Sequence, residues 1–170
     1  MTLLSREELT RLLQEIAAEL ESRGLRGDLF VVGGAAMALA YNTRRSTRDL
    51  DAVFEPKSVV YQAARAVGER HELPPDWLND GVKGFLPGGD LNATVLFDRP
   101  GLSVRIASPR YLFAMKAVAA RIERDASDLL HLYRLCGFAS LEEALECVEQ
   151  HYPPHLVPPK TVFILQELLG

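Results

Sequence analysis

Asp49 and Asp51 stand one residue apart at the start of an apolar stretch, and this spacing suits metal chemistry. On a β-strand, alternate side chains share a face, so both carboxylates would point one way while Leu50 and Ala52 point into a core. Close carboxylates repel each other unless one is protonated or a cation lies between them. A divalent cation such as Mg²⁺ or Mn²⁺ is the favoured remedy, since it binds carboxylate and phosphate oxygens. A solvated strand end is the alternative that the pair alone leaves open.

Gly33 and Gly34 stand where an apolar run over residues 28–32 gives way to a helical pattern over residues 33–41. Without Cβ atoms, the backbone N–H groups of a helix start can come close to a phosphate, and the helix dipole attracts its negative charge. A tight strand-to-helix turn is the other interpretation of the glycines alone. Together with Thr47 and the aspartate pair, they indicate a phosphate cradle and a metal site on adjacent strands.

Three arginines, Arg44, Arg45 and Arg48, lie on or beside the loop that connects the glycines to the aspartates. Guanidinium groups form strong paired hydrogen bonds with phosphate oxygens. Solvated loop charge is the alternative for each of them.

Lys116 is the only charge in residues 111–120, which read as a helix that is apolar nearly all round. An unpaired buried ammonium is costly, so the amine either extends to the surface or meets an anion in a cleft. Downstream, Asp125 and Asp128 share a helix face at i and i+3, with Arg121 four residues before Asp125. Asp128 borders an apolar stripe, from which its carboxylate could reach back to Lys116.

The elements that must position these residues follow from hydrophobic periodicity. A helix over residues 5–22 begins with a capping box formed by Ser5 and Glu8. The remaining pattern predicts strands over residues 28–32, 48–55, 91–97 and 102–108. It also predicts a helix over residues 57–71 and further helices from Pro109 to the end, the first of them capped by Ser108. The fold class is therefore α+β, with an α/β core over residues 1–108 and a C-terminal helical region over residues 109–170, packed as a single compact unit.

Composition narrows the class of protein. The chain is 48% hydrophobic and 25% charged, with a net charge of −4, which is typical of a soluble globular protein and excludes a polycation. No apolar run approaches the ~20 residues that span a membrane, and the first residues lack the features of a signal peptide. Cys136 and Cys147 are expected to be reduced thiols, and we expect a cytoplasmic protein.

Two motifs resemble a known family. Gly-Gly followed by "RSTRDLD", residues 45–51, resembles the active-site signature of the nucleotidyltransferase superfamily, which has the polymerase-β-like fold. The later "KAVAARIERDASDL", residues 116–129, looks like the Lys…Arg-Asp-x-x-Asp motif of its AbiEii-type branch. That branch contains toxins of bacterial toxin–antitoxin systems, including members that add nucleotides to tRNA 3′ ends. The resemblance covers roughly residues 28–135 and implies a small mixed sheet flanked by helices, with a C-terminal helical bundle.

The resemblance also implies roles for individual residues. By this resemblance, Asp49 and Asp51 would bind Mg²⁺. Gly33 and Gly34 would bracket the NTP triphosphate, and Ser46 and Thr47 would lie in the signature loop. Lys116 would contact the triphosphate, and Asp128 would complete the distal motif. One departure concerns a third carboxylate that many members carry on a later strand. Here Asn92 and Thr94 stand in that strand, while Asp90 and Asp98 flank it.

The predicted function is the Mg²⁺-dependent transfer of a nucleoside monophosphate from an NTP to an acceptor hydroxyl, that of a tRNA 3′ end, by a toxin with a cognate antitoxin. Candidate acceptor contacts are Arg44, Arg45, Lys83 and Arg110. A small-molecule or protein acceptor is the first alternative. A non-catalytic binding module, or an antitoxin that has this fold, is the second. Trp77 either stacks on a base or anchors its loop to the core.

Overall fold

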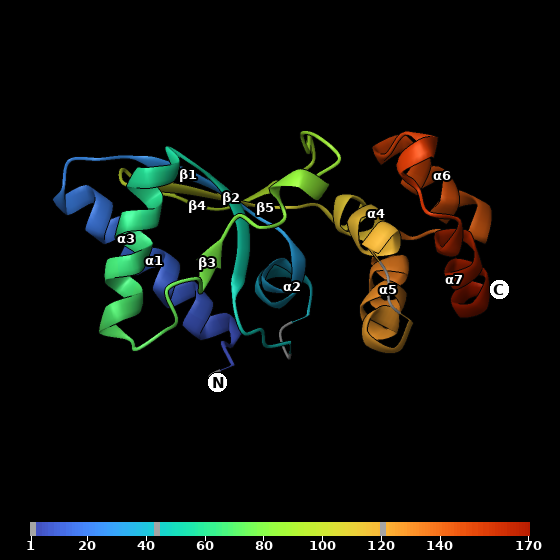
Figure 1. The fold of residues 1–170 in the computed structure, drawn as a ribbon, viewed down its shortest axis with the longest axis horizontal. Helices are drawn as coiled ribbons and strands as arrows, with labels where there is room; N and C mark the ends of the chain where they lie inside the picture. The colour runs from blue at the N-terminus through green and yellow to red at the C-terminus, as the bar shows by residue number, and fades with distance from the viewer. Residues whose placement is uncertain (1–2, 43–44, 120–121) are drawn as a thin grey trace. The chain divides into compact units, whose positions relative to one another are not determined.

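A computed structural model of the chain describes residues 3–42, 45–119 and 122–170 (Figure 1). The chain divides into two compact units, which are described separately. The sheet unit comprises Met1–Gly84 and Asn92–Ala107, and the helical unit comprises Phe85–Leu91 and Ser108–Gly170. The predicted α+β class is confirmed, with a mixed sheet in the first unit and helices in the second. Arg44 and Arg121 lie outside the described residues.

The sheet unit contains a five-stranded sheet in the order β3-β2-β1-β5-β4. Its strands are β1 (Gly27–Val31), β2 (Leu50–Glu55), β3 (Leu78–Asn79), β4 (Thr94–Asp98) and β5 (Leu102–Ile106). β1 pairs antiparallel with β2 and parallel with β5, β2 pairs parallel with β3, and β4 pairs antiparallel with β5. The predicted strands are therefore present, with bounds shifted or shortened by up to three residues, and β3 is an additional short strand.

One face of this sheet is buried, and helices α1 (Arg6–Ser22) and α3 (Lys57–Arg70) pack side by side against it (Figure 1). The side chains of Leu29, Ala52, Phe54 and Val104 are buried, while the residues between them are half-buried or exposed. This alternation is what a strand with one covered face produces. Asp51 consequently lies on the face opposite to α1 and α3.

The first helix begins where the capping box predicted. The Ser5 hydroxyl accepts a hydrogen bond from the Glu8 N–H at 3.3 Å, and the Ser5 N–H donates to the Glu8 carboxylate at 3.1 Å. These two bonds satisfy N–H groups that have no partner within the helix. They fix the point at which the chain enters α1.

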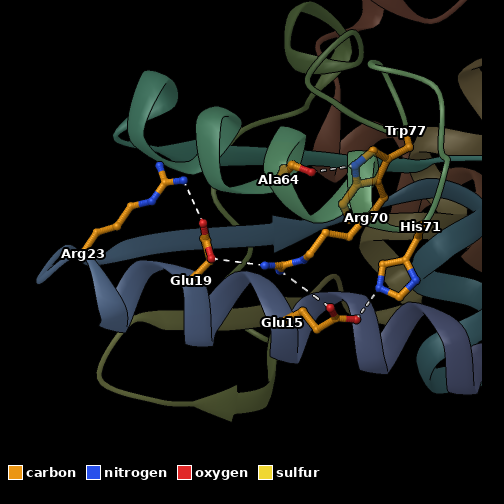
Figure 2. A network of polar contacts seen from close by, with 7 residues as sticks. All are labelled: Glu15, Glu19, Arg23, Ala64, Arg70, His71 and Trp77. Atoms are coloured by element: carbon orange, nitrogen blue, oxygen red, sulfur yellow. Dashed lines mark hydrogen bonds and ion pairs between the residues drawn. The ribbon is translucent and has the colours of Figure 1, made fainter.

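A charged network joins α1 to the end of α3 (Figure 2). Glu15 lies 2.6 Å from His71 Nε2 and 3.7 Å from Arg70, while Glu19 lies 3.5 Å from Arg70 and 2.8 Å from Arg23. Ion pairs this exposed contribute little each. The buried apolar faces of the two helices therefore supply most of the stabilisation, and the network adds polar contacts between them.

Trp77 anchors its loop to the core, which decides between the two interpretations of this residue. Its side chain is 1% exposed, and its indole N–H donates to the Ala64 carbonyl at 2.9 Å (Figure 2). The ring packs against Gly68 of α3, where a Cβ atom would lie 2.5 Å from Nε1. A ring enclosed in this way does not offer its face to a nucleobase.

The helical unit contains α4 (Pro109–Ala119), α5 (Ile122–Cys136), α6 (Leu141–His151) and α7 (Pro159–Leu169). α4 contacts each of the other three, and α7 contacts α5 and α6, so the predicted C-terminal bundle is confirmed. α4 begins as predicted, with Pro109 in its first turn and the Ser108 hydroxyl accepting from the Tyr111 N–H at 3.4 Å. Cys136 and Cys147 are free thiols, and burial raises the pKa of Cys147 to about 11, so this thiol stays protonated near neutral pH.

Residues Phe85–Leu91 belong to the helical unit and are held there by two tyrosines. The Tyr111 hydroxyl donates to the Gly88 carbonyl at 2.6 Å, and the Tyr152 hydroxyl donates to the Phe85 carbonyl at 2.8 Å. Burial and the nearby Asp90 carboxylate raise the pKa of Tyr111 to about 12, so the hydroxyl remains a donor over the physiological range.

Among the helices that the structure describes, none combines the length and apolar composition that a membrane span requires.

We expect Gly68→Ala to destabilise the sheet unit by about 1–3 kcal/mol, because the added methyl group forces the Trp77 ring from its place. Gly84→Ala is the matched control, since a Cβ atom there meets nothing within 4 Å. Urea unfolding followed by the fluorescence of Trp77, the only tryptophan, measures both variants. Equal stability of the two variants would contradict this account of the Trp77 contact.

Candidate active site

Gly33 is the residue that brings the backbone against an aspartate. It lies at the junction of β1 and α2 (Gly33–Ala36), in the left-handed region at φ +65°. The Val32 N–H donates to the Asp51 carbonyl at 3.0 Å, which ties this junction to β2. A Cβ atom at Gly33 would lie 3.2 Å from Oδ2 of Asp51. Only a glycine both adopts this backbone conformation readily and leaves room beside the carboxylate.

Gly34 makes a similar approach to the signature loop, which we define as residues 45–49. A Cβ atom at Gly34 would lie 3.2 Å from the Thr47 hydroxyl and 3.3 Å from Nη2 of Arg45. The Thr47 hydroxyl donates to the Asp49 carbonyl at 3.2 Å, and Nη1 of Arg45 donates to the Ser46 carbonyl at 3.1 Å. The structure thus gathers the side chains of Arg45, Thr47 and Asp51 beside the two glycines, and Ser46 and Asp49 are joined to this group through their backbone carbonyls. We call these seven residues the glycine–aspartate site.

The helix predicted over residues 33–41 is present, although only its start is α-helical. α2 continues directly into a π-helical turn, η1 (Met37–Tyr41). The Tyr41 hydroxyl donates to the Ala107 carbonyl at 2.6 Å and ties this end of the turn to the residue after β5. The two segments pack against β2 and α1, which fixes the glycines relative to the sheet.

Asp49 differs from its predicted setting. β2 begins at Leu50, so Asp49 lies in the bend before the strand, while Asp51 lies within it. Strand alternation therefore places Asp51 but does not by itself orient Asp49. Asp49 is held on both sides along the chain. The Thr47 hydroxyl donates to its carbonyl, and the pairing of β2 with β3 begins at the next residue, Leu50.

The donor set of this site fits Mg²⁺ or Mn²⁺. Asp49 and Asp51 offer hard carboxylate oxygens, and Mg²⁺ commonly takes one or two carboxylates together with the phosphates of its substrate. Within residues 3–42, 45–119 and 122–170, no group of three or more His, Cys, Asp or Glu side chains is placed to hold a metal ion. The two aspartates would therefore need substrate phosphates to complete the coordination.

Lys116 is held by two carboxylates within the helical unit. Its Nζ lies 3.2 Å from Oδ1 of Asp125 and 3.2 Å from Oδ2 of Asp128. The two aspartates are 8% and 7% exposed. The interpretation that Asp128 reaches back to Lys116 is confirmed, and Asp125 is a second partner. We refer to these three residues as the Lys116 cluster.

The strand expected to carry a third carboxylate is β4. Each of the two aspartates that flank it has a partner in the structure. The Asp90 carboxylate accepts from the Ser108 N–H at 2.6 Å and from the Ser108 hydroxyl at 3.0 Å, at the start of α4. Asp98 pairs with Arg26 at 3.1 Å. These contacts assign each acid a role in holding its own unit together.

Lys83 lies beyond the other end of β2 from Asp51. It lines an open hollow of about 460 Å³ with Asp28, Phe54, Glu55, Pro56 and Lys57. Asp51 and Glu55 are four residue steps apart along an extended strand, which is about 13 Å. Within the sheet unit, Lys83 is therefore not part of the glycine–aspartate site.

Arg110 belongs to the helical unit, where it lines a second hollow of about 250 Å³. Its guanidinium lies 5.0 Å from the ring centroid of Phe138, a cation–π distance. Glu143, Glu146, Cys147 and Gln150 complete the lining.

Sequence reasoning missed two contacts. The ion pair of Asp125 with Lys116 was not predicted, although the i, i+3 spacing of Asp125 and Asp128 placed both acids on one helix face. The pairing of Leu4 with Thr47, an isolated antiparallel bridge, had no short-range signal, because the partners are far apart in the sequence.

Comparison with known proteins gives one match. A family model described as "Nucleotidyltransferase of unknown function (DUF6036)" matches residues 7–145, a range that contains the glycine–aspartate site and the Lys116 cluster. No curated protein and no solved structure matches the chain. The superfamily that the sequence motifs resembled is thus supported, whereas the match identifies no branch, substrate or acceptor.

We expect Lys116→Met to destabilise the helical unit by about 3 kcal/mol, because removing one member of a buried ion pair leaves the other charge poorly compensated. Urea unfolding followed by circular dichroism, which reports the helices, measures the loss.

The triple variant Lys116→Met, Asp125→Asn, Asp128→Asn is the control, since it removes the charges together. We expect it to regain at least half of the lost stability. A triple variant no more stable than Lys116→Met would show that the loss comes from packing rather than from the isolated carboxylates.

Proposed function

Because this chain belongs to the DUF6036 family of nucleotidyltransferases, we propose that it moves a nucleoside monophosphate from an NTP to an acceptor hydroxyl at the glycine–aspartate site. The observation that carries the proposal is the approach of the Gly33 backbone to Asp51, with a Cβ position 3.2 Å from Oδ2. A phosphate bound at this backbone would lie beside carboxylates that can hold its counter-ion.

The glycines and the signature loop would bind the triphosphate. Gly33 and Gly34 have no side chains to keep a phosphate from their backbone N–H groups, and the Arg45 guanidinium beside Gly34 supplies a positive charge with several donors. Ser46 and Thr47 complete this wall of the site. These groups would hold the α-phosphorus in place for attack, which removes much of the entropic part of the barrier.

Asp49 and Asp51 would hold Mg²⁺ or Mn²⁺, which when bound offsets the charge on the phosphates and on the departing pyrophosphate. The attacking hydroxyl oxygen forms a bond to the α-phosphorus while the bond to pyrophosphate breaks. The proton released by that hydroxyl passes to the carboxylate of Asp49 or Asp51, which acts as general base.

For the acceptor we propose a tRNA 3′ end, and for the biological role the toxin of a toxin–antitoxin pair. The support is the resemblance of residues 116–129 to the AbiEii-type motif, which also extends the catalytic set to Lys116 and Asp128. Arg44, Arg45, Lys83 and Arg110 are the proposed contacts to the RNA backbone. Binding through such cations weakens steeply with salt.

We expect the chain, incubated with Mg²⁺, labelled NTPs and total RNA, to label RNA of tRNA size. Asp51→Asn should lower the rate about a hundredfold or more, because an amide replaces an anionic metal ligand. Asp28→Asn is the matched control, since Asp28 is an exposed acid on the same sheet face near the opposite end of β1, and it should retain the wild-type rate. Labelled products are separated on a denaturing gel.

Other outcomes of this assay decide between the alternatives. If a small molecule or a protein is labelled and RNA is not, the acceptor is a small molecule or a protein and not tRNA. No labelled product with any acceptor, or full activity of Asp51→Asn, contradicts the enzyme proposal. If the toxin role is correct, induction arrests growth with the wild-type chain and not with Asp51→Asn.

Gly33→Ala distinguishes a role of Gly33 in the transfer reaction from the cost of backbone strain alone. An alanine in the left-handed region costs about 1 kcal/mol wherever it stands. Gly24 has nearly the same φ, +67° against +65° at Gly33, but its Cβ would meet nothing within 4 Å. We expect Gly24→Ala and Gly33→Ala to lose similar stability in urea, and only Gly33→Ala to lose transfer, by about tenfold or more. Equal transfer rates would mean that the Asp51 contact is unimportant for the reaction.

A further inference from the structure

A short N-terminal segment, Leu3–Ser5, lies against the signature loop, and we call it the strap. The Leu4 N–H donates to the Thr47 carbonyl at 2.7 Å, and the Leu4 carbonyl accepts from the Thr47 N–H at 3.0 Å. These two bonds form an isolated antiparallel bridge between segments far apart in the sequence. Leu4 is thereby joined to the loop by hydrogen bonds between backbone atoms.

The strap is itself firmly anchored. The Leu4 side chain is 3% exposed, so it is part of the core. The next residue, Ser5, forms the capping box of α1, whose Leu9 and Leu13 are fully buried. The position of Leu4 is therefore set by the helix that follows it, and the bridge transmits that position to Thr47.

Thr47 passes the constraint on to the metal-binding residues. Its hydroxyl donates to the Asp49 carbonyl at 3.2 Å, and Asp49 lies before the first strand pairing of β2. On the other side of the loop, the Arg45 N–H donates to the Asn42 carbonyl at 2.9 Å. On the side away from β2, the support of Asp49 thus comes from Thr47, and that of Thr47 from Leu4.

We propose that Leu4 is a positioning residue, whose backbone bridge to Thr47 holds the signature loop in the conformation that binds a divalent metal–NTP complex. The inference rests on the proposed function, which it deepens by adding a residue that touches no substrate. Without the bridge, the loop would be ordered only on binding, and the lost backbone entropy would be subtracted from the affinity.

Leu4→Pro tests the proposal in the full chain, since it removes the N–H donor to Thr47. Leu4→Ala is the matched control, because it loses more of the buried side chain but keeps that donor. The binding of Mn²⁺ with the α,β-methylene analogue of each NTP is measured by titration calorimetry. We expect binding to Leu4→Pro to be about tenfold weaker, the effect of ordering one residue, and binding to Leu4→Ala to stay within about threefold of wild type.

The emission of Trp77 confirms that each variant is folded. If Leu4→Pro does not fold, Leu4→Gly replaces it, because it differs from Leu4→Ala mainly in backbone freedom and should bind more weakly than Leu4→Ala. Wild-type affinity of Leu4→Pro, or of Leu4→Gly where it is used, overturns the proposal. So does an equal loss of affinity in Leu4→Ala.

Amide hydrogen exchange separates failure of this inference from failure of the proposed function. If the wild-type chain binds no metal–nucleotide complex, the proposed function fails. Faster exchange at Thr47 and Asp49 in Leu4→Pro, and not in Leu4→Ala, then still supports the positioning role of Leu4. Unchanged exchange at these amides overturns it.

Discussion

The antiparallel pairing of β1 with β2 is the constraint on which the rest of the sheet unit depends. Its register sets Val31 opposite Ala52, so the chain leaves β1 and turns at Gly33 beside Asp51. A slip of one residue would move Asp51 to the face covered by α1 and α3 and would expose its apolar neighbours. The burial of Ala52 and Phe54 therefore fixes both the core and the position of the carboxylate.

Features that depend on neighbours in the sequence could be predicted. The Ser5 capping box, the helical segment after Gly33 and the Ser108 cap each involve residues within one helical turn, and each is present. Gly33 and Asp51 come together for a related reason. Two strands joined by one connection usually pair with each other, so their turn and their chemistry share one end of the sheet.

Features that depend on tertiary contacts could not be predicted. The bridge between Leu4 and Thr47 joins segments with no shared pattern, and Asp49 falls just outside β2 because the ladder with β3 starts at Leu50. The role of Trp77 was undecided, because a tryptophan in a turn-rich segment has the same sequence signal whether it binds a base or fills a gap over Gly68. Only the space that α3 leaves there decides between the two.

The chemical role proposed for the Lys116 cluster agrees with the energetics of buried ion pairs. Well-packed apolar side chains often stabilise a protein as well as a buried ion pair does, because burying charges costs desolvation energy. Yet α4, whose other side chains are mostly apolar, carries Lys116, and α5 supplies two nearly buried carboxylates to it. An amine that forms ion pairs with two carboxylates has a fixed orientation. A group that contacts a ligand needs a fixed orientation, whereas a group that only fills space does not. The cluster also coincides with the second motif of the nucleotidyltransferase resemblance, so the same three residues are singled out by geometry and by pattern.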